Sequence, residues 1–177
     1  MVATLDNSYF EKSKTFFESG DIVNSLDTYE KAISYIDHTK DKSSHIQFLN
    51  QVLEYCRENE LTEEEAIVLR SLGRTYSLFK LYVESLKCHE ESLKIQRKLG
   101  KKLEVAEGLL FLAEDLEVSG NYDKCVDSFK DAANLFHELG KLRKKKDIQK
   151  EIKRLKEFSK EMVEDEYLLH KYNIDKF

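Results

Sequence analysis

Charged side chains that recur on single helix faces are the residues with the clearest capacity for chemistry. Arg70 and Arg74 are four residues apart, so a helix places both guanidinium groups on one side. Spacings of three and four residues define a second such face, made of Glu107, Leu110, Glu114 and Glu117. A surface with mixed charge and apolar anchors suits an extended or helical peptide. The alternative is that these charges form a solvated face and pair across neighbouring helices.

Catalytic and metal-binding residues show no comparable pattern. The five histidines form no H-E-x-x-H motif and do not pair with cysteines at the spacing of metal ligands. Cys88 and His89 are adjacent, so a helix sends their side chains in different directions. No glycine-rich phosphate loop follows a strand, and the carboxylates spread along helix surfaces without converging. We expect no catalytic residue, no metal and no cofactor, and a protein that is not an enzyme.

The segment from Lys141 to Lys160 carries a competing signal. It holds ten lysines and arginines against three acids, a net charge of +7, which leaves −12 on the rest of the chain. Clustered cations on a helix can neutralise phosphates or meet an anionic membrane surface. However, Phe158 is its one aromatic residue, and the acidic remainder would repel a polyanion. Binding of nucleic acid or an anionic surface through residues 141–160 is therefore an alternative function. The segment could also dock on the acidic body of its own or a second copy.

The composition indicates the elements that position these residues. The chain of 177 residues has no proline, six glycines and 36% charged residues, which suits an almost wholly helical protein. Three cysteines without close pairing argue for a reducing compartment. The N-terminus lacks the features of a secretory signal, and no apolar run approaches the roughly 20 residues of a membrane span. We expect a cytoplasmic protein with one domain over residues 1–177.

Self-similarity at a fixed offset identifies these helices. Residues 66–100 match residues 106–140 at an offset of 40, with large residues on large and small on small. Such a repeat predicts stacked helical hairpins. Residues 6–39 read as a diverged first copy, which is offset from the next by 60 residues. Representative aligned positions are Leu72 with Leu112, Gly73 with Ala113, Ser85 with Cys125, and Ser25 with Cys125.

The remaining segments complete the predicted architecture. The offset of 60 instead of 40 places twenty inserted residues between the first and second copies, and these contain a helix over about 44–58. This helix either packs on the flank of the stack as a spacer or folds into the inner groove of the stack as an internal pseudo-ligand. A charged helix over about 141–169 would cap the open end of the stack. The sequence thus predicts an all-α, right-handed superhelix of three hairpins with an inserted helix and a C-terminal capping helix.

Signals for helix ends support these boundaries. Thr62 and Glu65 have the spacing of a capping box at the start of one helix. Gly100 and Gly140 are expected to end two others in the left-handed conformation.

The hairpins resemble tetratricopeptide repeats (TPRs). Their pattern has large residues and Leu-Gly on the first helix, Gly-x-Tyr at the turn, and alternating small and aromatic residues on the second helix. The second copy offers Leu69, Leu72-Gly73, Tyr76, Tyr82, Ser85, His89 and Ser92, and the third offers Leu109, Leu112-Ala113, Leu116, Gly120-Asn121-Tyr122, Cys125, Phe129 and Ala132. The 40-residue length is similar to the extended repeats of spindle-orientation adaptors, kinesin light chains and bacterial Rap-type regulators.

The resemblance implies a concave groove, lined by the first helix of each hairpin, that binds a peptide segment of another protein. The two-carboxylate clamp of chaperone-binding members is missing, because Phe10, Lys14, Ser71, Glu107 and Phe111 occupy its positions. We therefore expect an adaptor or assembly factor, with self-association as a further possibility. The implied groove positions are Asn7, Phe10, Lys14 and Phe17, then Ile67, Arg70, Arg74 and Ser77, and finally Glu107, Leu110, Glu114 and Glu117.

Overall fold

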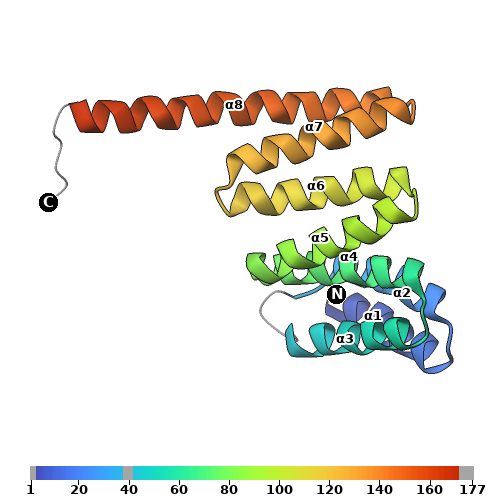
Figure 1. The fold of residues 1–177 in the computed structure, drawn as a ribbon. Coiled ribbons are helices and arrows are strands. Elements are labelled where there is room, and N and C mark those ends of the chain that lie inside the picture. The colour runs from blue at the N-terminus through green and yellow to red at the C-terminus, as the bar shows by residue number, and fades with distance from the viewer. Residues whose placement is uncertain (1–2, 38–41, 172–177) are drawn as a thin grey trace, which may run out of the picture.

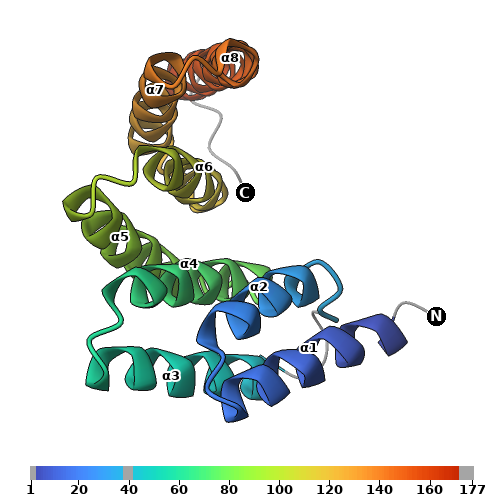
Figure 2. The same ribbon diagram turned by 90° about the vertical axis from the view of Figure 1, so that its right-hand side faces the viewer.

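Eight helices make up the part of the chain that the computed structural model describes, residues 3–37 and 42–171, with side chains described in 8–37 and 42–161. No strand occurs within these ranges. The helices stack in a curved array, with α5 and α7 in an outer row and α4, α6 and α8 in an inner row (Figures 1 and 2). The predicted all-α stack of helical hairpins is confirmed. The bounds are α1 (Ala3–Glu18), α2 (Ile22–Ile33), α3 (Lys42–Glu58), α4 (Thr62–Leu78), α5 (Tyr82–Lys98), α6 (Lys102–Val118), α7 (Tyr122–Glu138) and α8 (Leu142–Lys171).

A constant spacing governs these helices. From α2 onward each helix begins twenty residues after the previous one. In the described turns one residue adopts a positive φ, and the next amide donates to the carbonyl five residues earlier, as from Lys101 to Gln96 at 3.0 Å. The predicted stops at Gly100 and Gly140 are confirmed. The left-handed residues are Gly20, Gly100, Gly120 and Gly140 and, without glycine, Glu60 and Lys80.

Lys80→Gly is expected to stabilise the protein, because lysine at φ 59° brings its Cβ too close to the following carbonyl oxygen. Relief of about 1 kcal/mol is partly offset by the greater freedom of glycine in the unfolded chain, so the melting temperature should rise by roughly 1–2 °C. Lys94→Gly, in the exposed middle of α5, is the control and should cost about 1 kcal/mol. A lower melting temperature for Lys80→Gly would contradict this account.

Hairpin pairing follows small residues at the helix crossings. Helices α1–α2, α4–α5 and α6–α7 form the closest pairs. In the first pair the Ser25 hydroxyl donates to the carbonyl of Ser13 at 2.8 Å. In the second pair Ser85 donates to the carbonyl of Gly73 at 2.7 Å. The same contact thus recurs after sixty residues, which supports the expected first copy.

The inserted helix α3 has features of both predicted placements, because it lies on the flank of α4 and its aromatic side chains cover the predicted groove positions Phe10 and Phe17 of α1. It packs against α4, while α2 takes the inner position beside α4 (Figure 2). Aromatic side chains join α3 to α1: the ring centroids of Phe10 and His45 are 4.0 Å apart, and those of Phe17 and Phe48 are 5.8 Å apart. Helices α1 to α4 therefore surround one aromatic core. At its centre the Tyr29 hydroxyl lies 3.2 Å from His45 Nδ1 and 3.1 Å from Thr75 Oγ1.

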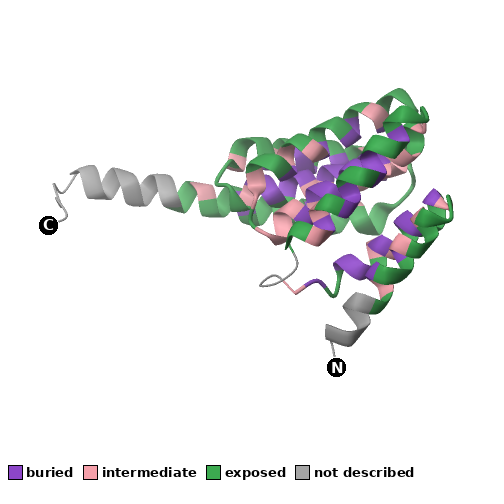
Figure 3. Ribbon diagram, turned by 90° about the horizontal axis from the view of Figure 1, so that it is seen from below, coloured by how far each residue is buried: buried purple, intermediate pink, exposed green. Residues whose placement is uncertain are grey.

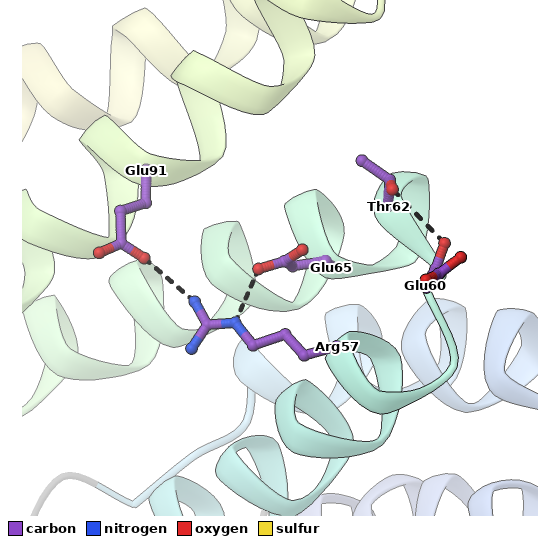
Figure 4. Close-up of polar contacts among 5 residues, drawn as sticks. All are labelled: Arg57, Glu60, Thr62, Glu65 and Glu91. Carbon is purple, nitrogen blue, oxygen red and sulfur yellow. Dashed lines mark hydrogen bonds and ion pairs between the residues drawn. The ribbon is translucent and has the colours of Figure 1, made fainter.

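An arginine ties α3 to the two helices that follow it (Figure 4). The Nε of Arg57 donates to Glu65 of α4 at 2.7 Å, and its Nη2 donates to Glu91 of α5 at 3.3 Å. The predicted capping box is wrong, because Thr62 is already the first helical residue and its hydroxyl donates to the carbonyl of Glu60 at 3.4 Å. Glu65 is instead used in the contact between helices.

Helix α8 closes the stack and extends beyond α7 (Figures 1 and 3). Ile148 and Leu155 are buried in the apolar cluster that it shares with α6 and α7. At the positions where α4 and α6 present apolar or small residues to a second helix, α8 carries exposed Gln149, Lys153 and Lys156. A polar face of this kind suits contact with solvent, so the arrangement agrees with a capping helix.

Candidate peptide-binding site on the inner helices

The inner helices bring together part of the predicted groove. A cavity of about 200 Å³ lies between α2, α4 and α6 and includes three predicted residues, Arg74, Ser77 and Glu114. Five further residues line it that the groove prediction did not include. These are Ile33, Leu78, His89, Phe111 and Asp115.

Asp115 is the residue that pattern analysis missed most clearly. Its column in the repeat holds Thr75 in the preceding inner helix and Leu155 in the next, so a buried carboxylate there departs from the pattern. The sequence signal for this site is therefore an acidic residue at a repeat position where the other copies have uncharged residues. His89, which takes an aromatic position of the repeat pattern, is buried and lies against this carboxylate.

Buried donors surround Asp115. The hydroxyls of Ser77 and Ser85 donate to its two carboxylate oxygens, and His89 Nε2 lies 3.4 Å from Oδ2. Burial alone would raise the pKa of Asp115, but the hydrogen bonds from His89, Ser77 and Ser85 outweigh it, so the pKa is lowered. The close fit of His89 also explains Gly73, because a Cβ at that position would lie 2.5 Å from the imidazole ring.

Arg74 has partners on both neighbouring inner helices. Its guanidinium forms an ion pair with Glu30 of α2, which also accepts from the Ser71 hydroxyl at 2.6 Å. The same guanidinium lies 4.8 Å from the ring centroid of Phe111 in α6. For Arg74, therefore, the guanidinium pairs across neighbouring helices, which was the alternative to a charge that is free to bind a peptide.

The other predicted groove residues are distributed along the same two helices. Glu117 accepts two hydrogen bonds from Arg154 of α8, at 2.8 and 2.9 Å. Arg70, Glu107 and Leu110 are half-buried on α4 and α6. The Nε of Arg70 is buried and has no hydrogen-bond partner within the described residues.

Lys14 and Phe17 do not join this group. They line a separate cleft of about 320 Å³ between α1 and α3, together with Phe48 and two glutamines of α3. Phe17 packs edge-on against Phe48 and Tyr55, and Lys14 Nζ lies 4.1 Å from the ring centroid of Phe10. The inserted helix thus covers the face of α1 that the resemblance assigned to the groove. The side chain of Asn7 lies outside the described residues.

The basic helix α8 uses part of its charge internally. Lys150 pairs with Asp147 at 3.1 Å, and Lys153 pairs with Glu157 at 3.6 Å. Arg154 contacts Glu151 as well as Glu117. These exposed pairs stabilise the helix only weakly. Binding of nucleic acid or an anionic surface by residues 141–160 stays a prediction.

The described ranges also bear on the sequence predictions for metal-binding groups, membrane-spanning helices and cysteine thiols. No group of three or more histidine, cysteine or acidic side chains there could hold a metal ion, and no helix is long and apolar enough to cross a bilayer. Burial, with a smaller effect of nearby glutamates, raises the pKa of the Cys56, Cys88 and Cys125 thiols to about 11. These thiols are therefore protonated at neutral pH and are weak nucleophiles.

Comparison with known proteins places the fold among TPR solenoids. No family model matches the sequence, and no curated protein matches it. A signal transduction ATPase with numerous domains (STAND) protein with a tetratricopeptide repeat sensor from Pyrococcus horikoshii is similar in structure, with a TM-score of 0.61 and 17% identity over 93% of this chain and 30% of that chain. A Rap protein complexed with competence and sporulation factor has a TM-score of 0.58 and 15% identity, covering 90% and 50% of the two chains. The apo form of RapI has a TM-score of 0.52 and 13% identity, covering 95% and 71%.

At these identities the likeness shows the fold alone. It is a TPR-like array of repeated helices, as the sequence predicted. The chain spans 30% of the STAND protein and 50% of the Rap protein.

Proposed function

We propose that this protein is a non-enzymatic interaction module that binds a peptide segment of a partner protein along the inner helices α4 and α6, and so acts as an adaptor or assembly factor. The cavity between α2, α4 and α6 is the observation that carries the proposal, because it joins Arg74 and Ser77 of one copy to Glu114 of the next. Arg70, Glu107, Leu110 and Glu117 extend this surface along the two helices.

The fold supports this assignment. TPR-like solenoids present side chains of successive inner helices to an extended ligand. One similar structure is that of a Rap protein complexed with competence and sporulation factor. The cleft between α1 and α3 that contains Lys14 and Phe17 would be a second contact region, which shares no lining residue with the first.

A charge exchange on the inner helices tests the proposal. Arg70→Glu combined with Glu107→Arg changes both helices without altering the net charge, and it leaves the Arg74–Glu30 pair intact. Affinity capture from native extract with the wild-type chain first identifies retained proteins by mass spectrometry. The double variant is expected to retain at least tenfold less of the partner with an unchanged melting temperature.

The matched control exchanges two exposed residues of the outer helix α5, Glu90→Arg with Lys94→Glu. It should retain as much partner as the wild type. Equal retention by the inner-face variant, or loss in the control alone, would refute binding on the inner helices.

A further inference from the structure

The cavity between α2, α4 and α6 has an excess of negative charge. Arg74 lines it, and its guanidinium already pairs with Glu30. Glu114 and Asp115 add two more carboxylates to the same site. One arginine therefore faces three carboxylates, which favours a cationic ligand over an anionic one.

Two acceptors at the cavity have no donor among the described residues. Glu114 is solvent-exposed and takes part in no hydrogen bond there, and partial desolvation and the neighbouring Asp115 raise its pKa. His89 has an almost completely buried side chain, yet its Nδ1 lacks a hydrogen-bond partner. With the ring proton on Nε2, which faces Asp115, Nδ1 carries a lone pair that can accept. A ligand that supplies a donor would satisfy the buried His89 Nδ1, and a positively charged ligand would pair with the exposed Glu114 carboxylate.

The remaining walls are apolar. Ile33 and Leu78 line the cavity, and so does Phe111, whose ring lies close to both Arg74 and His89. A volume of about 200 Å³ suits one side chain. A long alkyl stem could lie against these walls while its charged end stays at the acidic rim.

We propose that this cavity is a subsite for a lysine side chain of the bound peptide, with the alkyl stem against Ile33 and Leu78 and the ammonium group paired with Glu114. The inference rests on the proposed function and adds to it the identity of one ligand residue. An aspartate or glutamate would instead be repelled by the three carboxylates.

A small probe tests the subsite without knowledge of the partner. Nα-acetyl-lysine N-methylamide is titrated into the full-length chain with labelled isoleucine and leucine methyl groups. The methyl resonances of Ile33 and Leu78 are expected to shift and saturate. Nα-acetyl-norleucine N-methylamide, which lacks the ammonium group, should bind at least tenfold more weakly, as should the lysine probe to Glu114→Gln, because each change removes the ion pair between the ammonium group and Glu114.

Glu84→Gln, on the exposed face of α5, is the matched control and should bind the lysine probe like the wild type. Equal binding of the norleucine probe, no effect of Glu114→Gln, or no shift with the lysine probe would each overturn the subsite. The charge exchange at Arg70 and Glu107 is measured separately on the partner. If that exchange abolishes capture while the lysine probe does not bind, the subsite fails and the proposed function stands.

Discussion

Asp115→Leu is expected to lower the free energy of unfolding by about 2–4 kcal/mol, because buried donors lose their acceptor. Ser77 and the Nε2 of His89 would face an apolar side chain, whereas Ser85 keeps a second acceptor in the carbonyl of Gly73. The leucine has a suitable volume, so the loss comes from unsatisfied polar groups and not from a cavity. Urea denaturation of wild type and variant measures the difference.

The next interface along the stack supplies a matched rescue. There the corresponding residues are Cys125, Phe129 and Leu155, all of which are buried. Combining Asp115→Leu with Ser85→Cys and His89→Phe should therefore recover most of the lost stability, because the buried part of the cluster becomes apolar and the remaining hydroxyl, that of Ser77, is partly exposed to water. A triple variant as unstable as Asp115→Leu alone would show that the two interfaces are not interchangeable.

The lowered pKa of Asp115 also sets a pH dependence. A carboxylate with a lower pKa in the folded than in the unfolded state contributes stability above the unfolded value of about 3.9. That contribution is lost as the pH falls through the folded pKa. The stability difference between wild type and Asp115→Leu should therefore shrink below about pH 4. A difference that stays constant down to pH 2 would contradict the role of the ionised form.

Phe48→Ala should have the largest effect on the N-terminal half, about 3–5 kcal/mol. Phe48 is 5% exposed, and its ring packs against Phe10, Phe17 and Tyr29 with centroids 5.5, 5.8 and 5.9 Å apart. It therefore joins α3 to both α1 and α2. Hydrogen exchange should show lost protection in α3 before the outer helices of the C-terminal half are affected.

Tyr55→Ala provides the control for Phe48. Tyr55 lies about two turns further along α3, packs edge-on against Phe17 and is 37% exposed. Its removal should cost less than half as much, since a smaller apolar area returns to water. Similar losses for both variants would mean that the aromatic core is not the main contact of the inserted helix.

Repeated small residues made most of the fold predictable. Gly73, Ala113 and their partners Ser85 and Cys125 are small enough to let two helices approach, so their recurrence in register indicates the hairpins directly. The inserted helix was predicted too, but not its contacts. Its partners on α1 are aromatic residues that fit a groove position and a core position equally well, and only the packing distinguishes the two.

The candidate site was harder to predict because its key contacts join residues that are far apart in the sequence. Arg74 meets Glu30 from 44 residues away, and Ser77 meets Asp115 from 38 residues away. Helical spacing places charges on a face, but it does not say whether another helix neutralises them. Arg74 is neutralised by Glu30 of α2, and Glu117 is neutralised by Arg154 of α8. Glu114 forms no ion pair within the described side chains.

Because the helices begin at intervals of twenty residues, α2 has two packing partners. It is the second helix of the hairpin with α1 and also the inner neighbour of α4. The extra segment, which contains α3, is also twenty residues long. Its presence therefore does not change the spacing of any later helix. Lineages of such chains could therefore gain or lose a single helix and still keep their downstream ligand surface. An alignment restricted to whole forty-residue repeats would place a boundary between unrelated segments where one helix had been gained or lost.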